Sequence, residues 1–477
     1  LAGGLRLVEE TKPLHAIIKT TLFEEKPTMI PFGKIEHEYF TGTTCATADA
    51  AAALKKLIPA NYQGATRNKI ANLNGEGVYL ETADPERDGI NFPTAIVAGP
   101  AVQATYLAGC KLTDTLFVYA YADNADLEDG KCFAVSTSGN TATVGTAVEF
   151  EDGGATDVAI TRLSDTTFAV AYYDVGDSSY LKAVIGTVTG TVIAYGTIKS
   201  TAVIGTATAG IGICEPRDGY VFIAFQVTSG TDGSTICIPF TGTTFGTQTS
   251  EVEFDQTAPD YIACCTYDTG YVVVVYRDTG DTNYLHAWGA SVSATGVVSF
   301  GTEKALNATA VTGIQVSSPE TLNIVVSYIN SNSDAALIAT TVNEASPVVV
   351  ATGGTVITPF GAGTHTTVRH SMIDNTQGII IGDDGTYLKC IRFSKAASVL
   401  TADAVVDTAI EGRYASFAEG NCSTKGNICI AGRDSGNVFQ VVVGSYFENR
   451  IIDIRSTGTS KTYTFDVVPV FTKETAN

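Results

Sequence analysis

The stretch "VVVVYRDTGDTNYLHAWGASVSATGVVSFGTEKAL" occupies residues 272–306, and a similar stretch, "VAYYDVGDSSYLKAVIGTVTGTVIAYGTIK", occupies residues 170–199. Both begin with an apolar run that leads into an Asp-x-Gly-Asp motif, and both continue through Tyr-Leu into an alternating run. Both then contain a Thr-Gly pair and end with an aromatic residue followed by Gly-Thr. A motif that recurs in this way is typical of proteins built from structural repeats.

The apolar run before a polar turn also recurs elsewhere in the chain. One anchor residue marks each copy, and successive anchors are 51, 53, 51, 52, 54 and 50 residues apart. This narrow spacing indicates seven repeats of one structural unit. The anchors are Tyr121, Tyr172, Phe225, Tyr276, Tyr328, Gly382 and Gly432.

Each repeat contains four strand-like runs, which in the fourth repeat are residues 260–268, 271–278, 282–293 and 297–306. Short strands joined by Gly-containing turns form antiparallel meanders. The second run is apolar at nearly every position, so both of its faces need cover, and neighbouring repeats in a ring provide it. The sequence therefore predicts an all-β fold: a seven-bladed β-propeller of four-stranded antiparallel blades. A linear solenoid is the alternative.

The ring also needs a closing strand, because the seventh repeat shows only three clear runs, at residues 413–420, 427–434 and 437–445. Residues 90–98 precede the first repeat and are similar to the outer strand of the fourth repeat. We therefore expect residues 90–98 to pair with residues 437–445, since this pairing removes two exposed sheet edges.

The segments outside the repeats differ from them in pattern. Residues 44–62 carry a helix pattern that stops at Pro59. Residues 65–89 and residues 449–471 each contain two strand-like runs, and we expect these flanks to meet in a small mixed base. The predicted domains are an N-terminal base or attachment region at residues 1–88, the propeller at residues 89–447, and C-terminal strands that join the base at residues 448–477.

The composition excludes some classes of function. The formal net charge of −21 repels phosphate backbones, so nucleic-acid binding is not expected. No apolar run is long enough for a membrane-spanning helix, so membrane insertion is not expected either. No secretory signal pattern follows Leu1, although a processed start stays open. The ten cysteines form no C-x-x-C pair, and we expect reduced thiols without disulfides, including at Cys264 and Cys265.

Few residues suggest chemistry. The motifs at Asp174–Asp177 and Asp278–Asp281 have too few carboxylates for a calcium loop, so we expect tight turns. Tyr180 and Tyr284 follow these motifs and are expected to pack between blades, with sugar contact as the alternative. The sequence contains no known hydrolase or zinc motif, so we expect no catalytic residues, no metal site, no cofactor and no enzymatic activity. Ligand-binding residues stay open. The histidines are His15, His37, His286, His365 and His370.

Residues Tyr173–Thr197 and Tyr276–Thr302 resemble tandem repeats of bacteriophage virion proteins, especially tail-fibre and other particle-surface proteins. Residues 64–90 are similar to a small β-domain of phage structural proteins, although they lack its Asp-Gly-Thr. The resemblance implies a structural or adsorption role in a virion that is assembled in the host cytoplasm. It also implies contact with other virion proteins through the base, contact with a host-surface glycan or protein, and a homo-oligomer.

Three functions therefore remain under consideration. The main hypothesis is a structural component of a phage particle, a tail or capsid surface appendage with a role in host attachment. The alternative is a glycan-binding, lectin-like propeller, which predicts repeated exposed aromatic residues on one rim. A glycosidase is third, and it predicts carboxylates gathered at the mouth of the central channel.

Overall fold

The structure is a computed structural model that describes most of residues 104–447 together with separate strands outside this range. The short gaps are residues 139–140, 206–209, 228–231, 345–347, 352, 374, 384–386, 404, 412, 420–426 and 434–437. The separate strands are residues 15–18, 69–71, 78–81, 89–91, 97–101, 452–457 and 462–466. The chain forms two compact units, one of residues 90–446 and one of residues 1–89 with residues 447–477.

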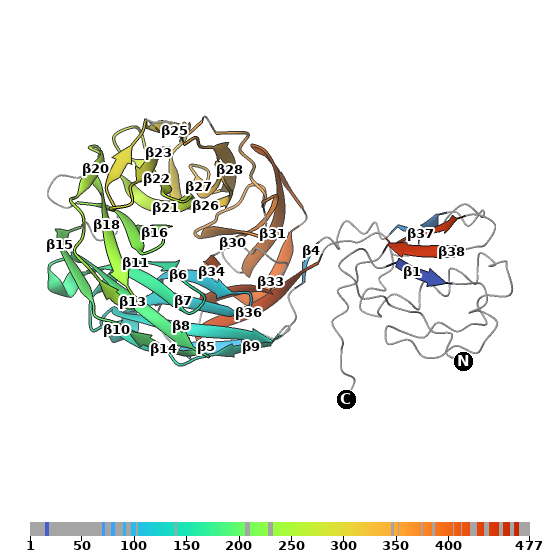
Figure 1. Ribbon diagram of the computed structural model, residues 1–477, viewed down its shortest axis with the longest axis horizontal. Coiled ribbons are helices and arrows are strands. Elements are labelled where there is room, and N and C mark those ends of the chain that lie inside the picture. Colours follow the sequence, from blue (N-terminus) through green and yellow to red (C-terminus); the bar gives the residue numbers. More distant parts are fainter. Residues whose placement is uncertain are drawn as a thin grey trace. The chain divides into compact units, whose positions relative to one another are not determined.

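In the larger unit the strands of the successive repeats follow one another around a ring (Figure 1). Repeat 1 comprises β6 (Ala104–Thr113), β7 (Leu116–Asp123), β8 (Asp129–Ser138), β9 (Thr141–Val144) and β10 (Val148–Glu151). Repeat 2 comprises β11 (Ala155–Arg162), β12 (Thr167–Asp174), β13 (Tyr180–Thr189), β14 (Val192–Tyr195) and β15 (Lys199–Ile204). Repeat 3 comprises β16 (Gly212–Arg217), β17 (Tyr220–Gln226), β18 (Gly233–Thr241), β19 (Thr244–Phe245) and β20 (Val252–Asp255).

The remaining repeats follow the same order. Repeat 4 comprises β21 (Asp260–Asp268), β22 (Tyr271–Asp278), β23 (Tyr284–Val292), β24 (Val298–Phe300) and β25 (Lys304–Asn307). Repeat 5 comprises β26 (Val311–Glu320), β27 (Asn323–Asn330) and β28 (Ala335–Thr341). Repeat 6 comprises β29 (Val368–Met372), β30 (Gln377–Asp383), β31 (Tyr387–Ala396), β32 (Val399–Ala402) and β33 (Val406–Glu411), and repeat 7 comprises β34 (Arg413–Glu419), β35 (Asn427–Arg433) and β36 (Val438–Phe447).

Each repeat is an antiparallel meander, as predicted, and in repeats 1, 2, 3, 4 and 6 the outer strand is split into two segments that both pair with the third strand. The number of separate blades is a correction to the sequence prediction. Within the described residues the ring contains six hydrogen-bonded sheets, not seven. The reason is a parallel pairing of β34 with β6, with Ala418 opposite Gly109 and Glu419 opposite Cys110, which merges repeats 1 and 7 into one ten-stranded sheet.

The N-terminal side of the chain pairs with repeat 7, as predicted, although the main pairing uses residues 97–101 rather than residues 90–98. Strand β5 (Val97–Ala101) pairs antiparallel with β36, with Val97 opposite Val441 and Ala101 opposite Val438. Strand β4 (Gly89–Asn91) also lies beside β36 in the same sheet. The pairing joins segments from the two ends of the repeat array. Along the paired residues, β5 covers the edge of β36 that would otherwise be free.

The hydrophobic core lies between consecutive repeats. Each cluster of buried apolar side chains in the described part of the chain combines the facing surfaces of two neighbours. One such cluster joins repeat 7 to repeat 1 and contains Tyr119, Phe133 and Phe439. The second strand of each repeat is buried on both faces because it contributes to the clusters on either side, which explains its continuous apolar sequence.

The Gly-Thr that ends the recurring motif is explained by a close backbone contact. An added Cβ atom on Gly196 would lie 2.0 Å from the carbonyl oxygen of Thr243, in a turn of the next repeat. An added Cβ atom on Gly145 would likewise lie 2.3 Å from the carbonyl oxygen of Thr191. A side chain at this position would collide with backbone, so the motif needs glycine wherever two repeats approach in this way.

The smaller unit contains one five-stranded antiparallel sheet in the order β1-β38-β37-β3-β2. Strands β2 and β3 confirm the two runs predicted in residues 65–89, and β37 and β38 confirm those predicted near the C-terminus. The predicted helix at residues 44–62 lies outside the described residues. No helix among the described residues is long and apolar enough to cross a membrane. The strands are β1 (His15–Ile18), β2 (Lys69–Ala71), β3 (Val78–Glu81), β37 (Ile452–Thr457) and β38 (Thr462–Asp466).

Candidate functional site

A polar turn connects the second and third strands of repeats 1, 2 and 4. The second strand ends in an aspartate whose carboxylate accepts a hydrogen bond from a backbone N–H inside the turn. This capping is turn chemistry and confirms the sequence prediction for the two Asp-x-Gly-Asp motifs. The bonds run from Ala125 to Asp123 at 3.2 Å, from Asp177 to Asp174 at 3.0 Å and from Gly280 to Asp278 at 2.8 Å.

In repeats 1 and 2 a lysine ammonium group lies among the carboxylates of this turn. The Nζ atom of Lys182 hydrogen-bonds to Asp174 and lies 3.3 Å from Asp177 Oδ2 and 3.8 Å from Glu151 Oε2. Glu151 ends the outer strand of repeat 1, so this ion pair joins two repeats. In repeat 1, Lys131 lies 2.7–3.3 Å from three aspartate carboxylates, those of Asp123, Asp126 and Asp129.

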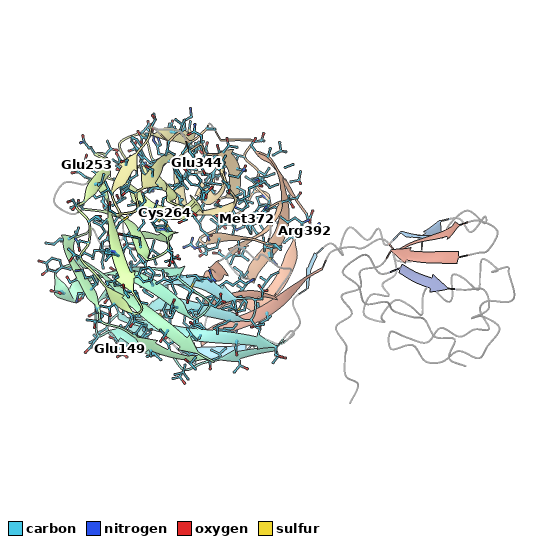
Figure 2. All side chains as sticks on the ribbon, viewed as in Figure 1. Glu149, Glu253, Cys264, Glu344, Met372 and Arg392 are labelled. Atoms are coloured by element: carbon cyan, nitrogen blue, oxygen red, sulfur yellow. The ribbon has the colours of Figure 1, made fainter. Side chains whose placement is uncertain are left out.

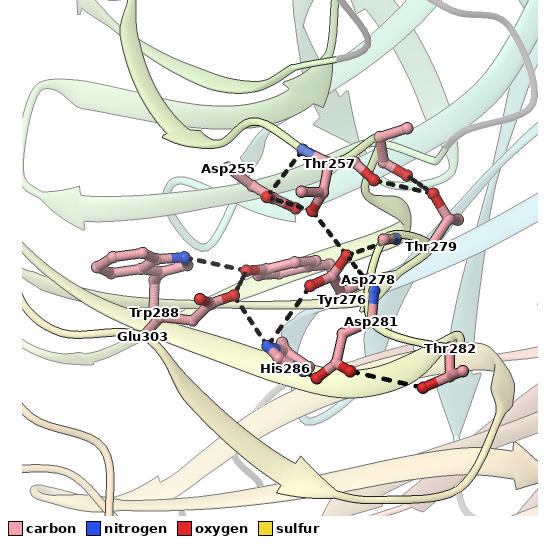
Figure 3. A network of polar contacts seen from close by, with 12 residues as sticks. Asp255, Thr257, Tyr276, Asp278, Thr279, Asp281, Thr282, His286, Trp288 and Glu303 are labelled. Atoms are coloured by element: carbon pink, nitrogen blue, oxygen red, sulfur yellow. Dashed lines mark hydrogen bonds and ion pairs between the residues drawn. The ribbon is translucent and has the colours of Figure 1, made fainter.

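In repeat 4 a histidine takes the place of the lysine. His286 follows its anchor by ten residues, as Lys131 and Lys182 follow theirs. Its Nδ1 atom lies 2.8 Å from Glu303 Oε1 and 3.9 Å from Asp278 Oδ2, and its Nε2 atom lies 3.1 Å from Asp281 Oδ2 (Figure 3). Burial lowers the pKa of His286, but the hydrogen bond and charge of Glu303 and the charge of Asp278 outweigh this and raise it.

Glu303 is an additional carboxylate that the other two turns lack. It follows the Gly-Thr of its repeat, and the corresponding residues are Ala147 in repeat 1 and Ile198 in repeat 2. The hydroxyl of the anchor Tyr276 donates to Glu303 Oε1, and Trp288 Nε1 donates to the Tyr276 oxygen at 3.0 Å. The hydrogen bond from His286 is the main reason why the pKa of Glu303 is lowered. Glu303 is therefore held as a carboxylate against the imidazole.

On the other side of the same network, one threonine hydroxyl group lies between two carboxylates. The hydroxyl oxygen of Thr257 lies 2.6 Å from both Asp255 Oδ1 and Asp278 Oδ1 (Figure 3). One hydroxyl carries one hydrogen, so it serves only one of these carboxylates through that bond at a time. The other oxygen of Asp255 is buried and has no hydrogen-bond partner among the described residues. Burial is the main reason why the pKa of Asp255 is raised.

Tyr261, the second residue of β21 in the same repeat, is an exposed aromatic residue. The guanidinium carbon of Arg277 lies 4.6 Å from the ring centroid of Tyr261, and Tyr261 as a whole residue is 39% exposed. Asp260 fixes the guanidinium through two hydrogen bonds, one of them 2.6 Å from Arg277 Nε to Asp260 Oδ1. Tyr261 has φ +50° in a β-bulge, and glycines with positive φ occupy the equivalent positions of repeats 3 and 5, at Gly210 and Gly313. The tyrosine is therefore held in a conformation that local geometry alone does not favour.

The inner strands surround a central cavity of about 600 Å³. Cys264 and Met372, which line it, lie at the inner edge of the ring, whereas Glu149 and Glu253 lie at its outer edge (Figure 2). At one position six inner strands contribute only small polar or thiol side chains, and each of these residues lies opposite the residue eight positions later in the chain. These residues are Cys110, Thr161, Cys214, Cys265, Ser317 and Ser371.

The charged residues of the cavity are mostly paired. Lys111 Nζ lies 2.5 Å from Asp114 Oδ1, and Arg162 Nη2 lies 2.6 Å from Asp165 Oδ1. Glu215 is half-buried, and burial together with the charge of Asp218 raises its pKa to about 7. This arrangement differs from the pair of facing carboxylates that glycoside hydrolysis requires, because two of the three carboxylates already neutralise a cation.

The other residues that the sequence analysis named take ordinary positions. His370 is buried, with Nε2 2.7 Å from Ser317 Oγ and Nδ1 2.8 Å from Ser327 Oγ. His365 is buried against the carbonyl oxygen of Asp383. His15 is in β1, and His37 lies outside the described residues. Tyr180 and Tyr284 are half-buried at the first position of their strands, and their expected packing between blades stays a prediction.

No protein-family model and no curated protein matches this chain. Solved structures do match. The BP39L lectin from Burkholderia pseudomallei aligns with a TM-score of 0.54 at 13% identity, over 73% of this chain and 98% of that chain. The Aleuria aurantia lectin aligns with a TM-score of 0.43 at 14% identity, over 65% and 98% of the two chains. The WD40 domain of Toxoplasma gondii coronin aligns with a TM-score of 0.46 at 8% identity, over 76% of this chain and 87% of that chain. At such identities the first of these likenesses shows the β-propeller fold alone.

Proposed function

We propose that this propeller is a carbohydrate-binding, lectin-like module, and that its ligand contacts Tyr261, Arg277 and Asp260. The observation that carries the proposal is the exposed ring of Tyr261 beside a guanidinium group that a carboxylate holds in place. A sugar ring presents C–H groups that pack on an aromatic face, and its hydroxyl groups donate to carboxylates and accept from guanidinium N–H groups. The three side chains supply each of these interactions within one small surface.

The charge state of this surface suits a neutral ligand with many hydroxyl groups. Arg277 and Asp260 neutralise each other, and their side chains are about equally exposed, at 21% and 20%. A charged ligand would have to break this bidentate pair, whereas hydroxyl groups use the remaining donor and acceptor positions without breaking it. The proposal therefore specifies neutral oligosaccharides. The lectin from Burkholderia pseudomallei illustrates that a propeller of similar architecture serves as a lectin.

The number of sites follows from the repeats. Tyr261 is the only aromatic residue among the large exposed apolar side chains of the described residues. The equivalent bulge positions of repeats 1, 2, 3 and 5 carry Tyr106, which is half-buried, and Asp157, Gly210 and Gly313. A rim of repeated exposed aromatic residues is therefore not found there. We propose one principal sugar site per chain rather than one per repeat.

The test is a screen of labelled full-length protein on a glycan array, followed by calorimetry with the best oligosaccharide. We expect one site per chain and a loss of about 2- to 13-fold in affinity for Tyr261→Gly, since a stacking contact contributes roughly 0.5–1.5 kcal/mol. Glycine is native to the equivalent bulges, so this variant removes the ring without straining the backbone. Val192→Ala, at a residue that is 69% exposed in repeat 2, is the control. Equal binding by Tyr261→Gly would refute the assignment.

Attachment to a phage particle remains compatible with glycan binding, because adsorption proteins contact surface sugars. Only the resemblance of the repeats supports it, and no comparison indicates a phage origin. In this hypothesis the five-stranded sheet of the flanks is the attachment element, since it contains strands from both ends of the chain. A chain limited to residues 89–447 should still bind the sugar and should no longer join a particle. Mass spectrometry of the incubated oligosaccharide should show no hydrolysis, and a cleaved product would favour the glycosidase alternative.

A further inference from the structure

We propose that the turn of repeat 4 binds a divalent transition-metal ion, with zinc as the best fit, through His286, Asp278 and Glu303. The ligand atoms of these three residues all lie within 4.8 Å of one another. In a tetrahedral zinc site with bonds of about 2.0–2.1 Å, neighbouring ligand atoms are about 3.3 Å apart. The distances from His286 Nδ1, 2.8 Å to Glu303 and 3.9 Å to Asp278, lie on either side of this value.

Comparison with the equivalent turns indicates that this position is built for a cation. In repeats 1 and 2 the ammonium group of Lys131 or Lys182 lies among the carboxylates. Repeat 4 has the same aspartates but replaces the lysine with the shorter histidine. It also adds Glu303, where repeats 1 and 2 have Ala147 and Ile198. A divalent ion in the space of the ammonium group supplies the charge that these two replacements remove.

The second nitrogen of His286 provides an independent observation. Its Nε2 atom lies 3.1 Å from Asp281 Oδ2. Histidines that bind a metal almost always donate their other N–H to a carboxylate, a carbonyl group or water, which fixes the tautomer and orients the ring. With Nε2–H donated to Asp281, the lone pair of Nδ1 points to the side of Asp278 and Glu303. Binding of the metal ion then displaces a proton from Nδ1 to solvent whenever the imidazole is protonated.

The surrounding carboxylates complete the argument. Asp255 Oδ2 is buried without a hydrogen-bond partner in the described part of the chain, and Thr257 shares one hydroxyl hydrogen between Asp255 and Asp278. The carboxylates of Asp278, Asp281 and Glu303 lie around one imidazole, and their side chains are 8%, 52% and 34% exposed, respectively. A divalent cation would compensate the charge of the buried Asp278 and the partly buried Glu303.

The choice of metal follows from the ligand atoms. One imidazole nitrogen with two carboxylates suits zinc and its transition-metal neighbours, whereas calcium and magnesium prefer oxygen ligands alone. The side chain of Glu303 is 34% exposed, so an ion can enter from solvent and keep water as a further ligand. The sequence analysis expected no metal because the Asp-x-Gly-Asp motif alone holds too few ligands. The additional ligand, Glu303, lies outside this motif, between the two outer-strand segments β24 and β25 of the same repeat.

The test uses the full chain after treatment with a chelator. Calorimetric titration with zinc chloride should give one bound ion per chain, and cobalt(II) should produce the visible absorption of a tetrahedral site. His286→Lys restores the residue of repeats 1 and 2, so we expect a folded protein that binds zinc at least 100-fold more weakly. Asp281→Asn leaves all three ligands in place and should weaken binding by about 10- to 100-fold, as loss of an orienting partner does.

Folding and specificity need their own measurements. The metal-free variants should unfold at temperatures close to that of the metal-free parent protein, and zinc should raise this temperature for the parent but not for His286→Lys. If His286→Lys does not fold, the Asp281→Asn variant alone decides the question. Absence of zinc binding by the parent would overturn the proposal. So would zinc affinity that is unchanged in the folded variants, or calcium binding that exceeds zinc binding.

Discussion

The hydroxyl group of Tyr119 in repeat 1 donates a hydrogen bond to the carbonyl oxygen of Cys429 in repeat 7, at 2.8 Å. This bond crosses the joint at which the two ends of the repeat array meet. It is buried in the cluster that contains Phe133 and Phe439, whose ring centroids are 5.2 Å apart. The joint is therefore held by side chains as well as by the parallel pairing of β34 with β6.

Removal of this hydroxyl group should weaken the joint. Tyr119→Phe keeps the ring in the cluster but leaves the Cys429 carbonyl without this donor, so we expect the free energy of unfolding to fall by about 1 kcal/mol. Urea-induced unfolding of the parent and the variant measures this change. An identical unfolding curve would mean that the joint does not depend on the bond.

His370 should make the propeller sensitive to acid. Burial and the charge of Arg369 lower the pKa of His370 to about 3, so its imidazole stays neutral in the folded state. The unfolded chain takes up a proton below about pH 6.5, and stability is therefore lost as the pH falls from that value towards 3. At pH 5 the uptake of this proton by the unfolded chain lowers the free energy of unfolding by about 2 kcal/mol. In His370→Gln the difference in unfolding free energy between pH 7 and pH 5 should shrink by a similar amount, and an unchanged difference would contradict this explanation.

The close contact at Gly196 should make substitution costly there. Gly196→Ala places a methyl group against the backbone of Thr243, and we expect a loss of about 1–3 kcal/mol because the backbone has to move. Gly190→Ala is the matched control in the same repeat. Gly190 has φ +63° and no atom within 4 Å of an added Cβ, so its cost should be about 1 kcal/mol, from conformation alone. A smaller loss at Gly196 than at Gly190 would count against the contact.

The cysteines should react as buried thiols. Burial raises the pKa of Cys132, Cys237 and Cys429 to about 12, so few of their thiolates form at neutral pH. A thiol reagent should therefore label these residues slowly in the native protein. After denaturation without a reductant, all ten cysteines of the chain should react. A lower final count would reveal a disulfide and refute the expected redox state.

The strands could be predicted from the sequence because each repeat solves the same local problem, an apolar run covered on both faces and a turn at each end. The closing strand was predicted for a related reason, because the seventh repeat lacks an outer strand of its own. The number of sheets could not be predicted, because the parallel pairing of Ala418 with Gly109 depends on how the ring closes rather than on any local sequence pattern. The sequence also contains the signals for His286 and Glu303, but only an alignment of the repeats shows that they replace a lysine and an apolar residue.

The surface proposed to bind a sugar could not be predicted from the repeats. Tyr261 and Arg277 are 16 residues apart in the sequence, and Asp260 pairs with Arg277 only because β21 and β22 are adjacent. No repeat other than the fourth carries this combination, so the periodicity gave no signal. The bulge at Tyr261 also could not be predicted from the sequence, although the glycines at the equivalent positions of other repeats are compatible with a positive φ there.

The pairing of β5 with β36 has a mechanical consequence. The chain enters β5 and leaves β36 at the same end of an antiparallel pair, so a force that pulled the two ends apart would break its hydrogen bonds one after another. Beyond the ring, β3 and β37 pair with each other, which ties the incoming and outgoing chain together. A pull applied to the flank sheet as a whole thus reaches both ends of the ring at once. We therefore expect such a pull to be shared by the two chain segments that lead to the ring, rather than to separate β5 from β36.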